Sequence, residues 1–361
     1  MHRITHKSTV MNKLFTLACI LAPYIAPCKT TGITIPTLYP HFGSSQPDIN
    51  GMGGTPVRLI SKVAATYDGS RYVPFDSARN TYSNGRGGIL DLDYTDNFLN
   101  FDNCVYYDYD KATNTYQNSL RYTQLFHPNN NIQYRIQEQW INNQVQWHNN
   151  VRHEYIYNPG LTRLEQTNIA SWNGSWQGNS NDYKLIYNTK NDIIEIQYKL
   201  NNTELDYDVN HNVIERVEYT YIWGQGWSYT DKYNFSYDGS DNLTSYTYQK
   251  FVNGNWVNAL KKDYMYSGDN IASTVEYSWK DNNWSLQRQN LFSYDGNNNK
   301  LADEYQQWDD ASGSFINIRK EEWTYNAQHQ PLTYKSLTWD AASQSWQPVG
   351  NDFLYHYEYE F

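Results

Sequence analysis

The sequence predicts an all-β protein built as an antiparallel meander of tandem β-hairpin repeats, each about thirty residues long. Three observations lead to this prediction: aromatic residues recur at a fixed spacing, polar turn sequences follow them, and aromatic and polar residues alternate in between. A strand sends alternate side chains to opposite faces, so each alternating stretch has one aromatic and one polar face. The chain holds 35 Tyr, 13 Trp and 12 Phe among 361 residues, so its core must be built largely from aromatic rings.

The clearest repeat unit lies between Trp227 and Trp256. Alternate residues from Trp227 to Tyr237 are mostly aromatic, and polar residues separate them. The segment Asp238–Asn242 reads Asp-Gly-Ser-Asp-Asn, which is turn chemistry because these residues accept a positive φ or hydrogen-bond their own backbone. Leu243 then opens a return strand, which a second turn of sequence Asn-Gly-Asn ends.

Copies of this unit fill the chain from residue 57 onward. In each copy, an aromatic residue near one turn is followed ten positions later by a second one, just before the next turn. The pairs are Tyr72 and Tyr82, Tyr116 and Phe126, Trp147 and Tyr157, Trp227 and Tyr237, Trp256 and Tyr266, Trp284 and Tyr294, and Phe315 and Tyr325; Trp176 with Tyr187 and Trp346 with Tyr357 have one residue more. Because the usual separation is even, we expect both aromatics of a copy to project from the same face.

One unit is shorter than the others. After Ile193 a plain turn at Asn201-Asn202 interrupts the pattern, which restarts at Tyr207-Asp208 after twenty residues instead of thirty. Nine or so units therefore predict about twenty antiparallel strands, each paired with its sequence neighbours.

The repeat resembles a known type. Tyr237-Asp238 followed by Asn242-Leu243, with a parallel from Tyr207-Asp208 to Val213, resembles the YD repeat of the RHS family. Gly-Asn-Trp-Val-Asn, beginning at Gly254, resembles more closely the repeats of secreted proteins from Bacteroidetes-type bacteria. The resemblance covers residues 57–361 and implies a curled or spiral sheet. RHS shells that release a toxin carry an Asp-Pro-x-Gly string, which this sequence lacks, so an RHS toxin is not implied.

The array must bend, because a flat sheet of about twenty strands is disfavoured. A curled or spiral sheet is the expected form, with a β-propeller and a closed barrel as alternatives. A lipid-facing barrel is disfavoured, because charged residues such as Asp231 and Lys232 lie at mid-strand on both faces.

Residues 1–28 read as an export signal. Met11 is the expected start of translation, and an apolar run from Leu14 to Ala26 follows it. Such a run suits a signal peptide and is too short to span a bilayer. Residues 29–56, rich in Thr, Pro, Ser and Gly, are the expected flexible linker, and residues 57–361 are the expected repeat domain.

Cys28 is a candidate for lipidation. The run Ile-Ala-Pro-Cys that ends at Cys28 resembles a bacterial lipobox, although Pro27 stands where such boxes carry a small residue. A surface or outer-membrane lipoprotein and a plainly secreted extracellular protein are the two alternatives. Cys19 lies inside the apolar run and Cys104 is alone in the mature chain, so no disulfide framework is expected.

Composition and motifs argue against catalysis and nucleic-acid binding. The formal net charge is −10, and no basic stripe that would follow a phosphate backbone is present. The chain lacks H-E-x-x-H, G-x-S-x-G, P-loop and G-x-G-x-x-G motifs, so we expect no enzyme, no cofactor, and no catalytic or metal site. The carboxylates of Asp91–Asp96 and Asp238–Asp241 either cap turns or supply oxygen ligands to calcium.

We therefore expect a non-enzymatic secreted or surface-attached repeat protein with a structural, adhesive or binding role. The alternative is a carbohydrate-binding module that stacks sugar rings on exposed aromatics. The candidate stacking residues are Trp147, Trp176, Trp227, Trp256, Trp284 and Trp346. The expected partner is a surface protein or a polysaccharide, with membrane contact only through a lipid anchor.

If Cys28 is lipidated, radiolabelled palmitate should mark the wild-type protein and not the Cys28→Ser variant. The labelled protein should also fractionate with membranes. Unlabelled wild-type protein recovered from the culture medium would instead show plain secretion.

Overall fold

The computed structural model describes residues 58–83, 100–350 and 352–360. The export signal with Cys28, the linker and Asp91–Asp96 lie outside these residues. The strands are β1 (Arg58–Tyr67), β2 (Tyr72–Thr81), β3 (Asn103–Asp110), β4 (Thr115–Phe126), β5 (Ile132–Ile141), β6 (Gln146–Tyr157), β7 (Leu164–Trp172), β8 (Trp176–Tyr187), β9 (Ile193–Tyr198), β10 (Asn201–Tyr207), β11 (Val213–Ile222), β12 (Gly226–Tyr237), β13 (Leu243–Val252), β14 (Asn255–Ser267), β15 (Asn270–Lys280), β16 (Asn283–Tyr294), β17 (Lys300–Asp309), β18 (Ser314–Tyr325), β19 (Pro331–Asp340), β20 (Ser345–Gln347) and β21 (Phe353–Glu360). The described residues include no helix long and apolar enough to cross a membrane.

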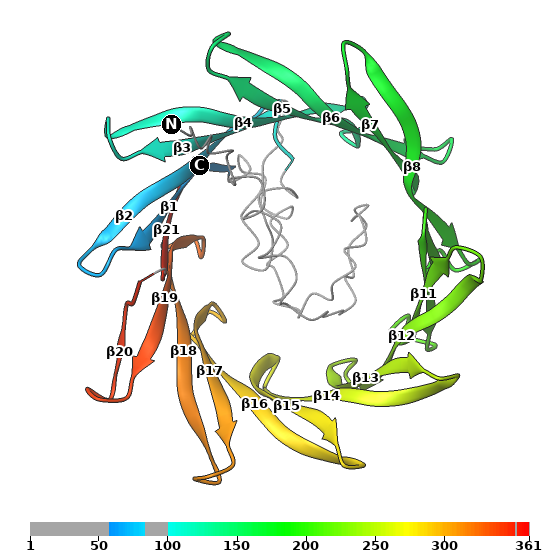
Figure 1. Ribbon diagram of the computed structural model, residues 1–361, viewed down its shortest axis with the longest axis vertical. Coiled ribbons are helices and arrows are strands. Elements are labelled where there is room, and N and C mark those ends of the chain that lie inside the picture. Colours follow the sequence, from blue (N-terminus) through cyan, green and yellow to red (C-terminus); the bar gives the residue numbers. More distant parts are fainter. Residues whose placement is uncertain (1–57, 84–99, 351, 361) are drawn as a thin grey trace, which may run out of the picture.

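The strands close into a ring. Each strand pairs antiparallel with its sequence neighbours, except that β20 pairs with β19 alone, and β21 pairs with β1 over most of its length. β20 and β21 both pair with β19 and share one strand position, so the 21 strands occupy 20 positions (21 − 1). Figure 1 shows this ring, from which the hairpin tips point outward. The predicted all-β hairpin meander is confirmed, and of the predicted forms the closed barrel is the one observed.

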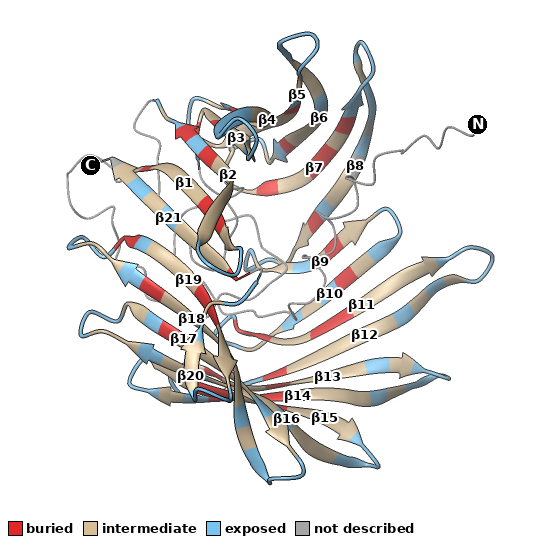
Figure 2. Ribbon diagram, turned by 60° about the vertical axis from the view of Figure 1, so that its left-hand side comes forward, coloured by how far each residue is buried: buried red, intermediate tan, exposed pale blue. Residues whose placement is uncertain are grey.

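The sheet has a single layer, and its buried side chains gather on one face. Phe235, Leu243, Tyr246 and Tyr264 pack with Val213 in one cluster, which partly buried tyrosines flank. Two further clusters lie on β1–β4 and on β6–β9. We call this side of the sheet the buried face. Figure 2 shows that burial is greatest along the strands and that the hairpin tips are exposed.

A tyrosine fastens the open end of most hairpins, opposite the hairpin's own turn. Its hydroxyl donates a hydrogen bond to the main-chain carbonyl of the residue that begins the partner strand, or of its neighbour. The seven pairs are Tyr82 to Leu59, Tyr187 to Leu164, Tyr207 to Ile193, Tyr237 to Val213, Tyr266 to Leu243, Tyr294 to Ile271 and Tyr325 to Lys300, with O···O distances of 2.6–3.1 Å. We call this bond the tyrosine latch. It explains why a tyrosine precedes most of these polar turns.

The turn that follows each latch is held by its first side chain. In Asp238–Asn242 one carboxylate oxygen of Asp238 accepts the amides of Ser240 and Asn242, at 2.8 and 2.9 Å. The other oxygen accepts the side-chain amide of Asn242 at 3.1 Å, and Asp241 takes a positive φ of 63°. These donors, the Asn242 amide foremost, lower the pKa of Asp238. The turns that begin at Asp208 and Asp295 repeat the arrangement.

Neighbouring turns also bond to each other. A side chain near the end of one turn contacts the positive-φ residue of the next turn along the ring. The pairs are Asn131 with Leu161, Arg163 with Asn191, Asp192 with His211, Asn212 with Asp241, Asn270 with Asn298, and Asn299 with His329, at 2.6–3.2 Å. Latches, the turns that follow them and these contacts therefore lie together at one end of the barrel, which we call the latch end.

A β-bulge in most hairpins overturns one expectation from sequence. In the β13–β14 pair Tyr248 faces Leu260 and Gln249 faces Asn258, so Ala259 is an extra residue. An extra residue reverses which face the following side chains occupy. Trp256 therefore lies on the face opposite Tyr264, although eight residues separate them. Equivalent extra residues are Phe75, Ser119, Asn150, Thr230, Gln287 and Ile318.

The part of each hairpin between its bulge and its turn is called a finger below. The β9–β10 hairpin has no comparable finger, because its strands span only six and seven residues. Its turn lies at Lys199-Leu200, two residues before the predicted Asn201-Asn202, which instead open β10. The short unit read from the sequence is thus confirmed, and the position of its turn is corrected.

Replacing Tyr237 by Phe should lower the free energy of unfolding by about 1 kcal/mol, because the buried Val213 carbonyl loses its donor. Urea unfolding followed by circular dichroism measures the change. Tyr116→Phe is the matched control, since the Tyr116 ring packs on Tyr109 at a finger tip and forms no latch. Equal losses in the two variants would contradict the role of the latch.

Candidate functional site

The finger tips carry a repeated pair of aromatic rings. In nine of the ten hairpins, two aromatic residues flank the turn as direct register partners, and their ring centroids lie 4.8–5.5 Å apart at interplanar angles of 60–74°. The pairs are Tyr67–Tyr72, Tyr109–Tyr116, Trp140–Trp147, Trp172–Trp176, Tyr221–Trp227, Phe251–Trp256, Trp279–Trp284, Trp308–Phe315 and Trp339–Trp346. Edge-to-face pairs of this kind stabilise a hairpin by about 0.5–1.5 kcal/mol beyond the area that they bury.

The six candidate stacking tryptophans all belong to these pairs. Trp147, Trp176, Trp256, Trp284 and Trp346 are half-buried, whereas Trp227 is 49% exposed. The ring of each one packs against its partner across the turn. The fingers therefore hold them as ordered surface side chains and not within the buried clusters.

Cations from the neighbouring finger or strand cover two of the paired rings. Arg121 lies 4.9 Å from the ring centroid of Trp147, and Arg152 lies 5.0 Å from that of Trp176. Arg121 also forms an ion pair with Glu138 at 2.6 Å. A cation over an aromatic face is attracted by the ring quadrupole. These rings are therefore engaged within the protein and are poor candidates for ligand stacking.

Two exposed aromatics break the ten-residue spacing pattern and were not predicted. Trp223 in the β11–β12 turn is 80% exposed, and Tyr229 on β12 is 44% exposed. Tyr229 directly precedes the bulge residue Thr230, at a position where four other fingers carry asparagine. The tyrosine at this position is visible in the sequence, and it is the signal from which the exposed ring could have been predicted.

The buried face carries a row of charges across β14–β17. Lys262 on β14 is 6% exposed and is the register partner of Glu276, which binds Arg288 at 2.6 Å. Burial lowers the pKa of Lys262 to about 7, against the opposing influence of Glu276. Burial likewise raises the pKa of Asp303 to about 6, although Asn290 donates a hydrogen bond to it at 2.7 Å. Desolvation causes both pKa shifts, so the shifts follow from how tightly the buried face of β14–β17 is packed.

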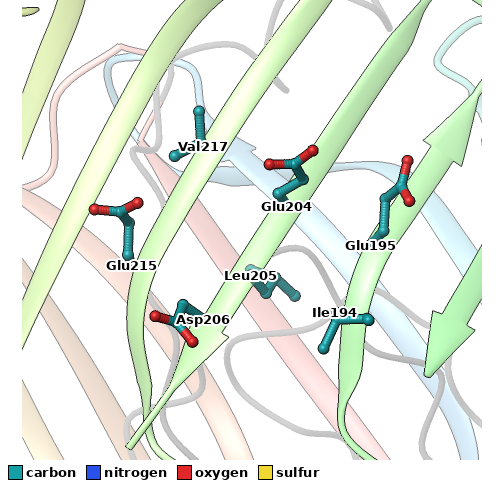
Figure 3. A pocket seen from close by; sticks show the side chains of 7 residues that line it. All are labelled: Ile194, Glu195, Glu204, Leu205, Asp206, Glu215 and Val217. Atoms are coloured by element: carbon teal, nitrogen blue, oxygen red, sulfur yellow. The ribbon is translucent and has the colours of Figure 1, made fainter. Parts of the chain in front are cut away.

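A hollow of about 310 Å³ lies over β9, β10 and β11, and Figure 3 shows the side chains that line it. Four of these residues are acidic: Glu195, Glu204, Asp206 and Glu215. Glu204 accepts the hydroxyl of Tyr219 at 2.6 Å, and Glu195 accepts the side-chain amides of Gln197 and Asn202 at 3.0 and 3.1 Å. Glu215 is ion-paired with Lys232. Side chains of the same sheet thus engage three of the four carboxylates.

Within the described residues, no group of three or more His, Cys, Asp or Glu side chains is arranged to hold a metal ion. In the turn Asp238–Asp241 the Asp238 carboxylate bonds its own turn, and Asp241 accepts Asn210 and Asn212 of the neighbouring turn. The turn-capping alternative therefore describes this segment.

Comparisons with known proteins do not place the chain in a family. No family model matches it, and no curated protein matches it. A protein of unknown function from Bacteroides fragilis is 17% identical with a TM-score of 0.31, covering 34% of this chain and 90% of its own. TcdB2-TccC3 is 11% identical with a TM-score of 0.30, covering 75% of this chain and 17% of its own. A porin-like protein from Bacteroides uniformis is 8% identical with a TM-score of 0.31, covering 84% of this chain and 98% of its own. These TM-scores are too low to identify a function.

The lowered pKa of Lys262 predicts that stability rises with pH. Between about pH 7 and pH 10 the unfolded chain binds a proton at this lysine that the folded protein has largely released. From pH 7 to pH 9 the free energy of unfolding should therefore increase by about 2 kcal/mol. Urea unfolding at the two pH values measures this, and Lys262→Met should abolish the increase. An equal increase in the variant would contradict the assignment.

Proposed function

We propose that this protein is a non-enzymatic, exported β-repeat scaffold that binds a surface partner through its finger tips. The observation that carries the proposal is the division of each repeat into two parts. Latches, turns and buried clusters lie on one side of the bulge, and half-exposed aromatic pairs lie on the other. The first part holds the ring closed, so the fingers are free to carry a surface for binding.

The chemistry of the described residues supports a role without catalysis. Three of the four carboxylates of the hollow over β9–β11 are engaged by tyrosine, amide and lysine groups of the same sheet. The strongly shifted charges Lys262 and Asp303 lie within a row of paired charges on the buried face. A general acid or base needs access to a reacting group, which neither arrangement supplies.

Export to the cell surface or the medium is part of this proposal. It rests on the apolar run and Cys28, which lie outside the described residues. A rigid ring that displays ten separate hairpin turns suits a structural or adhesive role at a surface, because many shallow contacts can act together.

Site-specific photocrosslinking in the producing cell tests this role. A benzophenone amino acid replaces Ser312, in the β17–β18 finger turn, or Gln225, in the β11–β12 finger turn. The control replaces Asn297, in the latch-end turn that begins at Asp295. We expect adducts of high mass from at least one finger position and none from the control. Adducts from the latch end alone, or from none of the three positions, would refute binding through the fingers.

A further inference from the structure

We infer that the fingers of β11–β12 and β13–β14 form a binding platform for a neutral polysaccharide. This inference deepens the proposed function, on which it rests, by naming a site and a ligand class. The platform consists of Tyr219, Tyr221, Trp223, Trp227, Tyr229, Phe251 and Trp256. It lies on the face of the sheet opposite the buried face.

The rings of the platform touch one another across two fingers. Tyr221 contacts both Trp223 and Trp227, with ring centroids 5.5 Å apart in each case. Tyr229 contacts Phe251 at 5.2 Å and Trp256 at 5.5 Å, which joins the two fingers. It also packs on Tyr219 at 4.7 Å. The rings thus form two contacting groups that occupy neighbouring positions along β11 and β12, two residues apart on each strand. In the Trp140–Trp147 and Trp172–Trp176 pairs, by contrast, an arginine covers one ring.

Comparison among the repeats shows that this surface is a local specialisation. Tyr229 directly precedes the bulge residue Thr230. The same position holds asparagine in four other units, at Asn118, Asn149, Asn258 and Asn317. Asparagine therefore satisfies the needs of the fold there. A tyrosine that is 44% exposed at this position adds surface that the fold does not require.

The exposure of the platform indicates a ligand. Trp223 is 80% exposed and Trp227 is 49% exposed. A lone exposed ring needs no explanation, but a contiguous exposed aromatic surface marks a binding site. The indole and phenol rings present flat apolar faces with polar edges, which suits the C–H face of a sugar ring with hydroxyls around it.

Uncharged and acidic hydrogen-bonding groups border the rings. Gln249 donates to Asn258 at 2.9 Å beside Trp256, and Asn234 donates to Gln249 at 3.4 Å. At the other side Glu204 accepts the Tyr219 hydroxyl. Amides of this kind both donate to and accept from sugar hydroxyls, and carboxylates accept from them.

The charges near the platform favour a neutral chain over an anionic one. Lys232 is the register partner of Gln249, and its charge is neutralised by the ion pair with Glu215. Glu195, Glu204 and Asp206 lie in the adjoining hollow. These carboxylates would repel a sulfated or uronic polysaccharide or an anionic lipid surface.

Affinity electrophoresis of the full chain tests the inference. Native gels contain a soluble β-glucan, a galactomannan or a dextran, and parallel gels contain dextran sulfate. We expect at least one neutral polymer to retard the wild type. Tyr229→Asn combined with Trp223→Ala should weaken binding about tenfold or more, because two stacking contacts are lost. Tyr229→Asn installs the residue that other repeats carry, so the fold should persist, and urea unfolding verifies this.

Trp172→Ala is the control, since Trp172 is also an exposed finger tryptophan but lies away from the platform. It should leave the retardation unchanged. Absence of retardation in all three neutral polymers would overturn the inference, as would equal losses in Trp172→Ala or retardation by dextran sulfate alone. Finger crosslinks without polysaccharide binding would overturn the inference and leave the scaffold proposal standing.

Discussion

The hydrogen bond from a latch tyrosine to the main chain of its partner strand is the interaction on which the ring depends. A hairpin is closed at its turn and splays at its other end unless something joins the two strands there. Tyr237 joins them at Val213, and the same bond recurs in six further hairpins. Because each latch lies beside the turn that leads to the next hairpin, it also fixes where that hairpin begins. A single-layer sheet without a second covering layer can therefore keep its register around a full circle.

The bulge separates this structural part of the repeat from the finger beyond it. An extra residue such as Ala259 reverses the side-chain faces and increases the local twist, so the finger turns its aromatic pair away from the buried face. The fingers consequently vary without disturbing the ring. The β9–β10 unit has almost lost its finger, whereas the β11–β14 region carries additional exposed rings. Variation of this kind within one chain is what a scaffold with a localised binding surface would show.

The sequence predicted the hairpins well because their signals are local. The ten-residue spacing and the Asp-to-Asn turns depend only on neighbouring residues, as at Tyr237 and Asp238. The face of Trp256 was predicted wrongly, because a bulge adds a residue without changing any spacing along the chain. Ring closure was predicted only as one of three forms, since it depends on β21 meeting β1 from the far end of the sequence. Trp227 and Trp256 of the platform were predicted as stacking candidates, whereas Trp223 and Tyr229 were not, because they lie outside the repeat spacing.

Hydrogen–deuterium exchange of the full chain tests most directly whether the latch end alone holds the ring together. Amides between each bulge and the latch, such as those of Tyr233–Ser236, should exchange only through global unfolding. Amides of the finger beyond the bulge, such as those of Gly226–Tyr229, should exchange much faster through local opening. The account predicts a boundary in protection at the bulge residue of each long hairpin. Uniform protection from the latch to the finger tip, or faster exchange at the latch end, would contradict it.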